Sequence, residues 1–341
     1  MLSGQPQRPC AADWDAVVER LRTAESVALA CHVGPDGDAL GSMLALGLAL
    51  RALGKQVVAS WGGEPFEVPT SYGSLPGLDL LVPATRFPAA PELLVTLDTG
   101  SADRLGSLAD RVQTAGCCIV VDHHASNTCF GGLNLVDRDA AATAVLVAEL
   151  VDRLGLPLTQ ELAAPLYTGL ITDTGMFRYA ATTPSVHHLA ARLLATGIRH
   201  DLIARVIYDT APFDYVRLLG AACGRSSLEV DAAGGLGLVW TTVPAEDLVA
   251  AKLGLADVEG LIDVLRTAQE AEVAVVLKGD PVEGGWKVSL RSKGSIDVGA
   301  LCTALGGGGH RVAAGFSTDA EPDQVLARLR EDLRSAPHLP G

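Results

Sequence analysis

The feature that most constrains the fold is a series of short apolar runs separated by longer segments with helical periodicity. Each run has four or five residues and is bounded by turn residues: Val27–Cys31, Val57–Ser60, Leu93–Leu97 and Cys118–Val121. Such runs are typical of strands buried on both faces. Leu40–Leu53 and Ala140–Leu154 have helical patterns that end at glycines. Strands alternating with helices predict an α/β domain with a mostly parallel sheet flanked by helices.

The second half of the chain predicts a smaller α/β domain. Pro184–Thr196 is expected to be a helix, and the segment 199–224 is expected to be a helical linker. The elements expected after it are strands Leu228–Val230, Leu236–Thr242, Val273–Leu277 and Trp286–Arg291, with helices Ala245–Lys252 and Asp257–Ala268. A chain of 341 residues fits two domains. We therefore expect a larger domain at 1–198 and a smaller one at 225–341, with the functional site in the cleft between them.

The composition argues against several classes of protein. The chain is 48% hydrophobic and 19% charged, which allows a buried core, and its formal net charge is −14. Long duplex nucleic acid is usually held by a basic surface, so such a partner is not expected. Seven cysteines without a C-x-x-C pair favour a reducing, cytoplasmic location. Residues 1–15 lack a signal-peptide core, and Leu40–Leu50 is too short to cross a membrane.

Residues of the kinds that bind metals follow the predicted strands. His32, Asp36 and Asp38 come after the first strand, and Asp98 comes after the third. The fourth strand ends in Asp122-His123-His124, and Asp173 lies near the end of an apolar helical stretch. Taken singly, an aspartate such as Asp38 is equally well explained as a helix cap. Because open α/β sheets bind ligands at the carboxyl ends of their strands, we expect these residues to converge.

Convergence of so many carboxylates requires positive charge. Five aspartates at one sheet edge would raise one another's pKa values. Two divalent ions would remove the repulsion, and mixed oxygen and nitrogen ligands suit Mn(II), Fe(II) or Co(II) better than calcium. The lack of thiolate ligands argues against structural zinc. Two ions roughly 3.5–4 Å apart are a recurring arrangement for phosphoester hydrolysis. We therefore predict two Mn(II) ions in one site.

A glycine run near the carboxyl terminus is the second unusual motif. Gly306–Gly309 is followed by His310 and Arg311. Successive glycine N–H groups can form an anion-binding nest, although a surface turn is the alternative. The run does not fit the G-x-G-x-x-G or P-loop patterns, so a dinucleotide or ATP site is not expected. In the strand predicted at Trp286–Arg291, alternation places Arg291 on the face opposite the apolar positions.

Together these motifs resemble the DHH phosphoesterases, the superfamily that includes the RecJ-like nucleases. The matching residues are His32-x-x-x-Asp36-x-Asp38, Asp98, Asp122-His123-His124 and Asp173. The glycine run, preceded by Ser289-Leu-Arg291-Ser292, resembles the DHH-associated C-terminal domain. The resemblance spans roughly residues 25–318, keeps the motifs in family order and lacks no ligand. It is strongest to small bacterial enzymes that act as oligoribonuclease (nanoRNase) and as 3′-phosphoadenosine-5′-phosphate (pAp) phosphatase.

The resemblance implies a role for each motif residue. One ion would be held by His32, Asp36 and Asp98, and the other by Asp38, Asp98, His123 and Asp173, so that Asp98 bridges them. The implied catalytic residues are Asp122, which orients the imidazoles, and His124, which faces the scissile phosphate. The candidates for substrate binding are Asn127, Arg178, Arg291, Gly307, Gly308, Gly309, His310 and Arg311.

The implied activity is Mn(II)-dependent hydrolysis of short oligoribonucleotides and linear dinucleotides to 5′-mononucleotides, and of pAp to AMP. Both reactions break a phosphorus–O3′ bond, so one site can serve both, and cyclic dinucleotides such as c-di-AMP are further candidate substrates. A homodimer is implied as well. Three alternatives remain: an inorganic pyrophosphatase of the same superfamily, a nucleotide-binding module without turnover, and a processive single-strand exonuclease. The glycine motif, the complete ligand set and the net charge of −14, respectively, argue against them.

Overall fold

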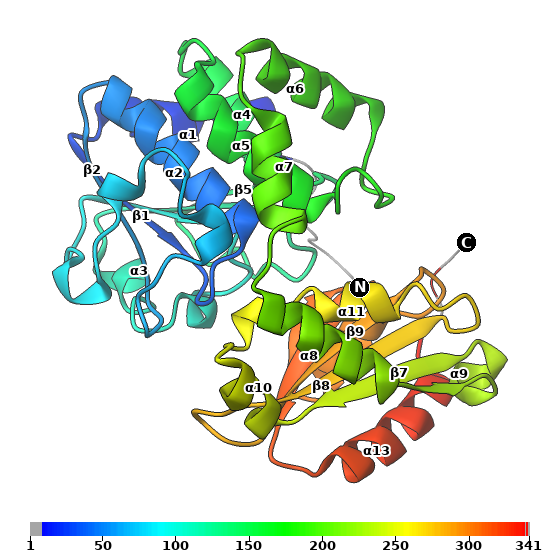
Figure 1. The fold of residues 1–341 in the computed structure, drawn as a ribbon. Helices are drawn as coiled ribbons and strands as arrows, with labels where there is room; N and C mark the ends of the chain where they lie inside the picture. Colours follow the sequence, from blue (N-terminus) through cyan, green and yellow to red (C-terminus); the bar gives the residue numbers. More distant parts are fainter. Residues whose placement is uncertain (1–8, 338, 340–341) are drawn as a thin grey trace. The chain divides into compact units, whose positions relative to one another are not determined.

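A computed structural model describes residues 9–337 and 339 and divides the chain into two compact units. The division falls between Thr210 and Ala211. The segment expected to be one helical linker contains two helices, α7 (His200–Tyr208) and α8 (Phe213–Gly224). Pro212 directly precedes α8, and α7 belongs to the first unit while α8 belongs to the second (Figure 1).

The first unit is built on a five-stranded sheet in the order β2-β1-β3-β4-β5, with every neighbouring pair parallel. The strands are β1 (Ser26–Cys31), β2 (Gln56–Trp61), β3 (Leu93–Leu97), β4 (Cys118–Asp122) and β5 (Leu133–Val136). The four strands expected from the sequence are confirmed. The edge strand β5 was not expected, because only two of its four residues are buried and its apolar run is short.

Helices cover one face of this sheet. They are α1 (Ala11–Thr23), α2 (Gly37–Ala52), α4 (Thr143–Arg153), α5 (Gln160–Asp173) and α6 (Pro184–Ala195). The opposite face is covered by the segments on either side of β3, residues 82–87 and 102–115, which include the short helix α3 (Arg111–Thr114) and the buried side chains of Phe87, Leu105 and Leu108. Burial on both faces explains why the strands are apolar throughout.

Helix α2 lies at the centre of the unit and is buried on all sides, as its uniformly apolar sequence predicts. It packs closely against α5 through two glycines. A Cβ atom at Gly41 would lie 2.3 Å from the backbone oxygen of Pro165, and one at Gly169 would lie 2.7 Å from Oδ1 of Asp38. Only glycine permits this backbone approach. The contact brings the first turn of α2 next to the end of α5.

The second unit contains a mixed six-stranded sheet in the order β10-β11-β9-β8-β7-β6. Its strands are β6 (Ser227–Glu229), β7 (Leu238–Val243), β8 (Val273–Gly279), β9 (Trp286–Ser292), β10 (Gly308–His310) and β11 (Ala313–Thr318). Only β7 and β8 pair in parallel. The helical segments are α9 (Ala232–Gly235), α10 (Ala245–Ala251), α11 (Leu261–Leu265), α12 (Val298–Ala304) and α13 (Pro322–Ser335).

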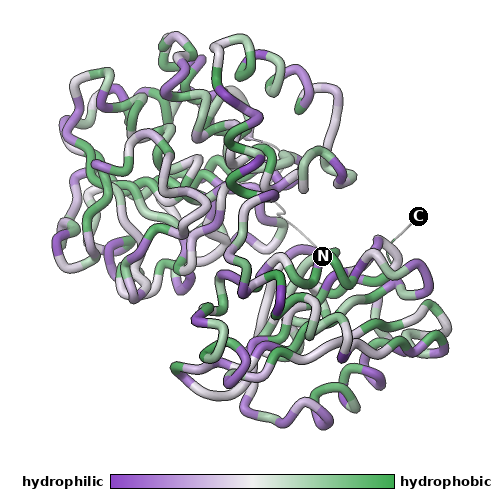
Figure 2. Tube along the Cα trace, in the orientation of Figure 1, coloured by the Kyte–Doolittle hydropathy of each residue, from purple (hydrophilic) through white to green (hydrophobic). Residues whose placement is uncertain are grey.

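Each face of this sheet has its own core. Helices α8, α10 and α11 pack over β7 and β8 on one face, while α12 and α13 pack on the other against β8, β9 and β11. Val288 and Leu290 are buried in the second core, so the alternation predicted for β9 is confirmed. Hydrophilic and hydrophobic residues alternate along α13 in Figure 2, in keeping with its one buried side.

Two expectations for this unit are corrected. The helix expected at Asp257–Ala268 is interrupted, because a 3₁₀ turn at Ala256–Val258 precedes the short helix α11. The glycine run is neither a nest nor a free turn: Gly308–His310 forms the edge strand β10, paired antiparallel with β11. Glycines have low strand propensity, so pairing with a neighbouring strand overrode the local preference here.

Two findings relate to the expectations drawn from composition. All seven cysteines are free thiols. Among the residues that the structure describes, no helix combines the length and the apolar character needed to cross a membrane.

Candidate metal centre and active site

The predicted metal ligands lie at the carboxyl edge of the N-terminal sheet. His32 follows β1, Asp98 follows β3 and His123 follows β4, so parallel strands deliver all three to one edge. The strand order reverses between β1 and β3, and open α/β sheets bind ligands at such a point. Asp38 in α2 and Asp173 at the end of α5 complete the group, since α2 and α5 pack against each other.

Asp36 fixes the loop between β1 and α2. Its Oδ1 accepts hydrogen bonds from the backbone N–H groups of Asp38 (3.1 Å) and Ala39 (3.0 Å), so Asp36 is the N-cap of α2. Its Oδ2 lies 3.8 Å from Nε2 of His32. Asp38, which the sequence alone allowed as a cap, is instead fully buried in the first turn of α2.

The ligand atoms form two groups that share a neighbour. His32, Asp36 and Asp98 make one group and Asp38, His123 and Asp173 make the other, and within each group the ligand atoms lie within 4.8 Å of one another. Oδ2 of Asp98 is 3.6 Å from Nε2 of His32, and its Oδ1 is 3.5 Å from Nε2 of His123. The Asp98 carboxylate therefore lies between the two groups.

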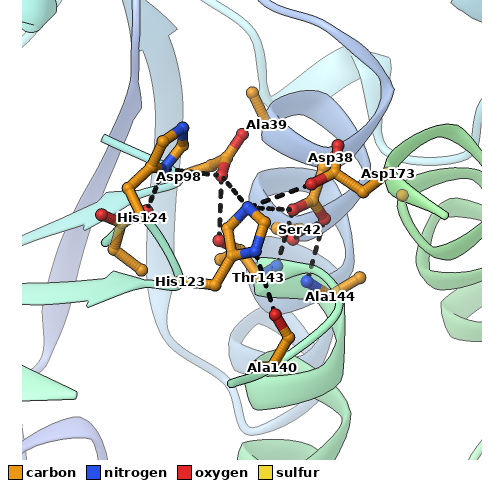
Figure 3. A network of polar contacts seen from close by, with 12 residues as sticks. Asp38, Ala39, Ser42, Asp98, His123, His124, Ala140, Thr143, Ala144 and Asp173 are labelled. Atoms are coloured by element: carbon orange, nitrogen blue, oxygen red, sulfur yellow. Dashed lines mark hydrogen bonds and ion pairs between the residues drawn. The ribbon is translucent and has the colours of Figure 1, made fainter. Parts of the chain in front are cut away.

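His123 is the centre of the second group (Figure 3). Its Nε2 lies 3.0 Å from Oδ2 of Asp173 and 3.9 Å from Oδ2 of Asp38. Ligand atoms that share one ion through bonds of about 2.1 Å lie about 3 to 4 Å apart, depending on the angle between the bonds. The separations in this cluster thus fit the occupation of each group by one divalent ion.

The two histidine rings are oriented as metal ligands are. Nδ1 of His32 donates to the backbone oxygen of Val33 (3.0 Å), and Nδ1 of His123 donates to that of Ala140 (3.2 Å). Each Nε2 therefore faces the carboxylates. A carbonyl on one ring nitrogen and an ion on the other is the usual environment of a metal-binding histidine. Imidazole nitrogens combined with carboxylate oxygens fit a divalent transition ion.

Strong mutual interactions perturb the titratable groups of the cluster. Burial raises the pKa of Asp38 well above its usual value, and neighbouring carboxylates raise it further. Burial also acts to raise the pKa of Asp98, but His32 and the other imidazoles hold it well below its usual range. Burial acts to lower the pKa of His32, yet Asp36 and Asp98 raise it well above its usual value. The carboxylates thus depend on nearby positive charge.

The backbone at Asp98 is strained. Its φ angle is 54°, in the left-handed region that costs a non-glycine residue roughly 1–2 kcal/mol. A hydrogen bond from its N–H to the backbone oxygen of Val121 (3.1 Å) holds this conformation. Strain of this kind concentrates at functional sites, where the surrounding structure compensates for it.

Asp122 and His124 form a pair at the edge of the cluster, where Nδ1 of His124 lies 3.6 Å from Oδ1 of Asp98. Nδ1 of His124 donates to Oδ1 of the fully buried Asp122 at 2.7 Å. Asn127 donates to Oδ2 of Asp122 at 2.6 Å and to the backbone oxygen of Thr99 at 3.1 Å. Burial acts to lower the pKa of His124, but Asp122 and Asp98 raise it above its usual value. The structure therefore places Asn127 behind Asp122, within the protein.

Arg178, the other predicted substrate contact of this unit, is exposed. Its Nε donates to the backbone oxygen of Gly175 at 2.6 Å. It follows three residues with positive φ angles, Gly175, Met176 and Phe177. This left-handed turn begins two residues after Asp173, the last residue of α5, so Arg178 lies close to the proposed ligand in the chain.

Strand pairing sorts the predicted substrate residues of the C-terminal unit. Directly paired residues share a face of a sheet. His310 pairs with Ala313, which pairs with Arg291, and Gly308 pairs with Gly315, which pairs with Ser289. Arg291, His310 and Gly308 therefore share one face, with small residues between them.

The remaining members of the motif have structural roles or lie beyond the strand. A Cβ atom at Gly307 would lie 2.1 Å from the backbone oxygen of Gly315, and one at Gly309 would lie 2.5 Å from that of Ala313. Gly309 also has a φ of 137°. By contrast, a Cβ atom at Gly308 would meet nothing within 4 Å. Arg311 is exposed in the turn after β10.

Comparison with known proteins identifies both halves of the chain. Residues 26–170 match the DHH family N-terminal domain, and residues 249–336 match the DHHA1 domain. Over 331 residues the chain is 38% identical to the bifunctional oligoribonuclease and PAP phosphatase NrnA of Thermus thermophilus, and the alignment covers 95% of each protein. The chain belongs to the DHH family of phosphoesterases. It is a hydrolase that acts on phosphoester bonds.

Two further comparisons agree with this assignment. A Bacillus subtilis protein, also named bifunctional oligoribonuclease and PAP phosphatase NrnA, is 27% identical over 321 residues, which is 92% of this chain and 96% of that protein. A solved structure of an exopolyphosphatase-related protein from Bacteroides fragilis has a TM-score of 0.87 at 24% identity and covers 97% of this chain and 98% of that one. The structural likeness shows that the described part of the chain has the fold seen there.

This DHH-family site also contains residues that the sequence analysis did not single out. Thr143 and Ala144 donate backbone N–H groups to Asp38, and the Thr143 hydroxyl donates to Asp98. The Ser42 hydroxyl donates to Oδ1 of Asp38 at 3.1 Å. In the sequence, Thr143 lies among alanines near the start of the predicted helix Ala140–Leu154. Its hydroxyl is the only feature there that could have indicated a role in the site.

Proposed function

We propose that this DHH-family protein is a Mn(II)-dependent enzyme that hydrolyses short oligoribonucleotides to 5′-mononucleotides and pAp to AMP. The observation that carries the proposal is the pair of ligand groups that share Asp98. Support for the substrate class comes from the relative with 38% identity, whose name states both activities. The same reaction extends the proposal to linear dinucleotides and to cyclic dinucleotides such as c-di-AMP.

Two divalent ions would be bound by the six ligand residues. His32, Asp36 and Asp98 would hold one, and Asp38, Asp98, His123 and Asp173 would hold the other. Such ions, when bound, lower the pKa of water and neutralise the charge of a phosphate group. Mn(II) is proposed because both nitrogen and oxygen donors are present and thiolates are absent from these two groups.

The pair of Asp122 and His124 would supply the proton for the leaving group. With Nδ1 of His124 donating to Asp122, the proton that can be transferred is the one on Nε2. Asp122 and Asp98 raise the pKa of His124, which favours the protonated ring. When the phosphorus–O3′ bond breaks, the O3′ oxygen would take this proton. Asn127 keeps Asp122 in place through its own hydrogen bond.

The C-terminal unit would bind the rest of the nucleotide. Arg291 and His310 offer positive charge on one face of the sheet, and Gly308 leaves open space beside them. Arg291 suits a phosphate because its guanidinium can donate two parallel hydrogen bonds. Gly307, Gly309 and Arg311 would support this surface, and Arg178 would add a contact in the N-terminal unit.

The proposal includes the state and setting of the enzyme. We expect a homodimer in the cytoplasm that does not bind long duplex nucleic acid, because the resemblance implies the dimer and the net charge of −14 disfavours a duplex. Sedimentation of the purified protein and a duplex-binding assay test these two points.

The decisive experiment is product analysis with Mn(II) across five substrates: pAp, a 5′-phosphorylated dinucleotide, a pentamer, a cyclic dinucleotide and pyrophosphate. We expect mononucleotides from the short oligomers and AMP from pAp. Preferred cleavage of pyrophosphate would indicate a pyrophosphatase, and rates that increase with oligomer length would indicate a processive exonuclease. Binding without turnover would contradict the enzymatic role.

A further inference from the structure

One short segment that contains none of the proposed metal ligands is hydrogen-bonded to three of them. The backbone oxygen of Ala140 accepts from Nδ1 of His123 at 3.2 Å. Three residues later, the hydroxyl of Thr143 donates to Oδ1 of Asp98 at 3.0 Å. The backbone N–H of Thr143 donates to Oδ2 of Asp38 at 2.6 Å. Segment 140–144 thus ties together ligands that come from α2, β3 and β4.

The segment is placed to do this because it forms the start of α4. The first N–H groups of a helix have no partner within the helix, and they favour a negative charge nearby. Here the N–H groups of Thr143 and Ala144 contact both oxygens of Asp38, the latter at 2.9 Å. These bonds are buried, since Asp38 and Thr143 are both 0% exposed. Figure 3 shows Thr143 and Ala144 directed at the two aspartates.

Thr143 is the only residue of the segment that uses a side chain. Its hydroxyl contacts the carboxylate that lies between the two ligand groups, on the same oxygen that faces His123. Asp98 also has a strained backbone, so its carboxylate needs more than its own strand to fix its direction. Packing alone does not require the hydroxyl at this position, because valine has nearly the same shape as threonine.

We propose that Thr143 is a positioning residue of the metal centre: its hydroxyl orients Asp98 as the bridging ligand. This inference rests on the proposed function, in which Asp98 contacts both ions. Contacts that orient ligands typically change metal affinity or activity by about 10- to 100-fold when removed. Thr143 would therefore influence the affinity of both ions through Asp98, without being a ligand itself.

The test compares three variants of the full-length protein. Thr143→Val removes the hydroxyl, Thr143→Ser restores it, and Thr168→Val is the matched control. Thr168 is equally buried, but its hydroxyl donates only to the backbone oxygen of Ala164 in its own helix. Mn(II) affinity is measured by calorimetric titration, and metal-free thermal unfolding is measured alongside it. Activity on pAp is then resolved into kcat and KM.

We expect Thr143→Val to weaken Mn(II) binding about tenfold or more, with Thr143→Ser within about threefold of the wild type and Thr168→Val unchanged. Metal-free unfolding of the two valine variants should be similar. Wild-type Mn(II) affinity in Thr143→Val would overturn the role of Thr143 while leaving the proposed function intact. Mn(II) binding by the wild type without hydrolysis of any substrate would contradict the proposed function alone. No Mn(II) binding by the wild type would contradict both.

Discussion

The two units of this protein present polar residues in opposite ways. In the N-terminal unit, buried acids and imidazoles from separate elements meet at one sheet edge and are held by internal hydrogen bonds, as the Asp98 and His123 contacts show. In the C-terminal unit, Arg291 and His310 lie on one face of a sheet simply because their strands pair in register. The proposed metal centre depends on convergence and internal support, whereas the proposed phosphate-binding surface depends only on alternation along paired strands.

The largest effect is expected from a substitution of Asp98, the residue between the two ligand groups of the N-terminal unit. Asp98→Asn keeps the shape of the side chain but removes the charge shared by both ligand groups. We expect activity on every substrate to fall more than about 100-fold, since losing a ligand costs more than losing a contact that orients one. Metal-free stability near neutral pH should also fall, because the imidazoles that hold the pKa of Asp98 below its usual range lose their charged partner. Substrate turnover and thermal unfolding measure the two effects.

The control for Asp98→Asn is Asp152→Asn in the same unit. Asp152 pairs with Arg192 on the surface, where a salt bridge contributes little. This variant should keep full activity. Equal activity in both variants would show that the carboxylate cluster is not the centre of the chemistry.

The second prediction concerns metal addition. A ligand at about 100 times its Kd stabilises the state that binds it by about 2.7 kcal/mol. Amide hydrogens that exchange only when the protein unfolds should then exchange about 100-fold more slowly. We expect Mn(II) to slow amide hydrogen exchange in β3, α2 and α4. Exchange in β8 and β9 of the C-terminal unit should stay unchanged. Equal protection of both units would mean that the ions do not act through the N-terminal cluster alone.

The third prediction sharpens the role of the C-terminal face. Arg291→Ala should raise the KM for pAp about tenfold or more, because a charged hydrogen bond contributes about 1.5–3 kcal/mol. Mn(II) affinity should not change. Lys287→Ala is the matched control, since Lys287 occupies the same face of β9 but pairs with Glu283. Steady-state kinetics decide this prediction, and a similar KM in both variants would remove Arg291 from the substrate site.

The smallest expected effect tests an ordinary ion pair in the C-terminal unit. Arg330 donates two hydrogen bonds to Glu229, at 2.7 and 2.8 Å, and holds the pKa of that carboxyl below its usual value. A lowered folded pKa contributes stability above the unfolded value near 4.5, and the contribution is lost as the pH falls through the folded value. Since both groups are partly exposed, solvent screening keeps it below about 1 kcal/mol.

Glu229→Gln therefore should lower the free energy of unfolding slightly at pH 7, with the difference disappearing at low pH. Urea unfolding followed by tryptophan fluorescence measures it, because Trp240 donates to Glu229. A difference that persists at pH 3 would show that the charge of Glu229 is not its source.

Much of the fold was predictable because a strand buried on both faces is a short, continuous run of apolar residues in the sequence. The four strands expected in the first unit are present, since each is apolar over its whole length. The edge strand β5 and the glycine strand β10 were not predictable, because one is half exposed and the other has low strand propensity. Similarly, the segment expected to form one helix at Asp257–Ala268 is divided into a 3₁₀ turn at Ala256–Val258 and the short helix α11.

By itself, the sequence determined which residues are candidate metal ligands and that His32, Asp98 and His123 follow parallel strands, whose carboxyl ends meet at the same edge. Only the tertiary structure decided that Asp36 rather than Asp38 caps α2, that Asp98 lies between the two histidines, and that α4 begins against Asp38. These arrangements depend on packing between elements about 100 residues apart, such as Asp38 and Thr143, which differ by 105 positions. The sequence pattern within a single helix or strand does not indicate such long-range contacts.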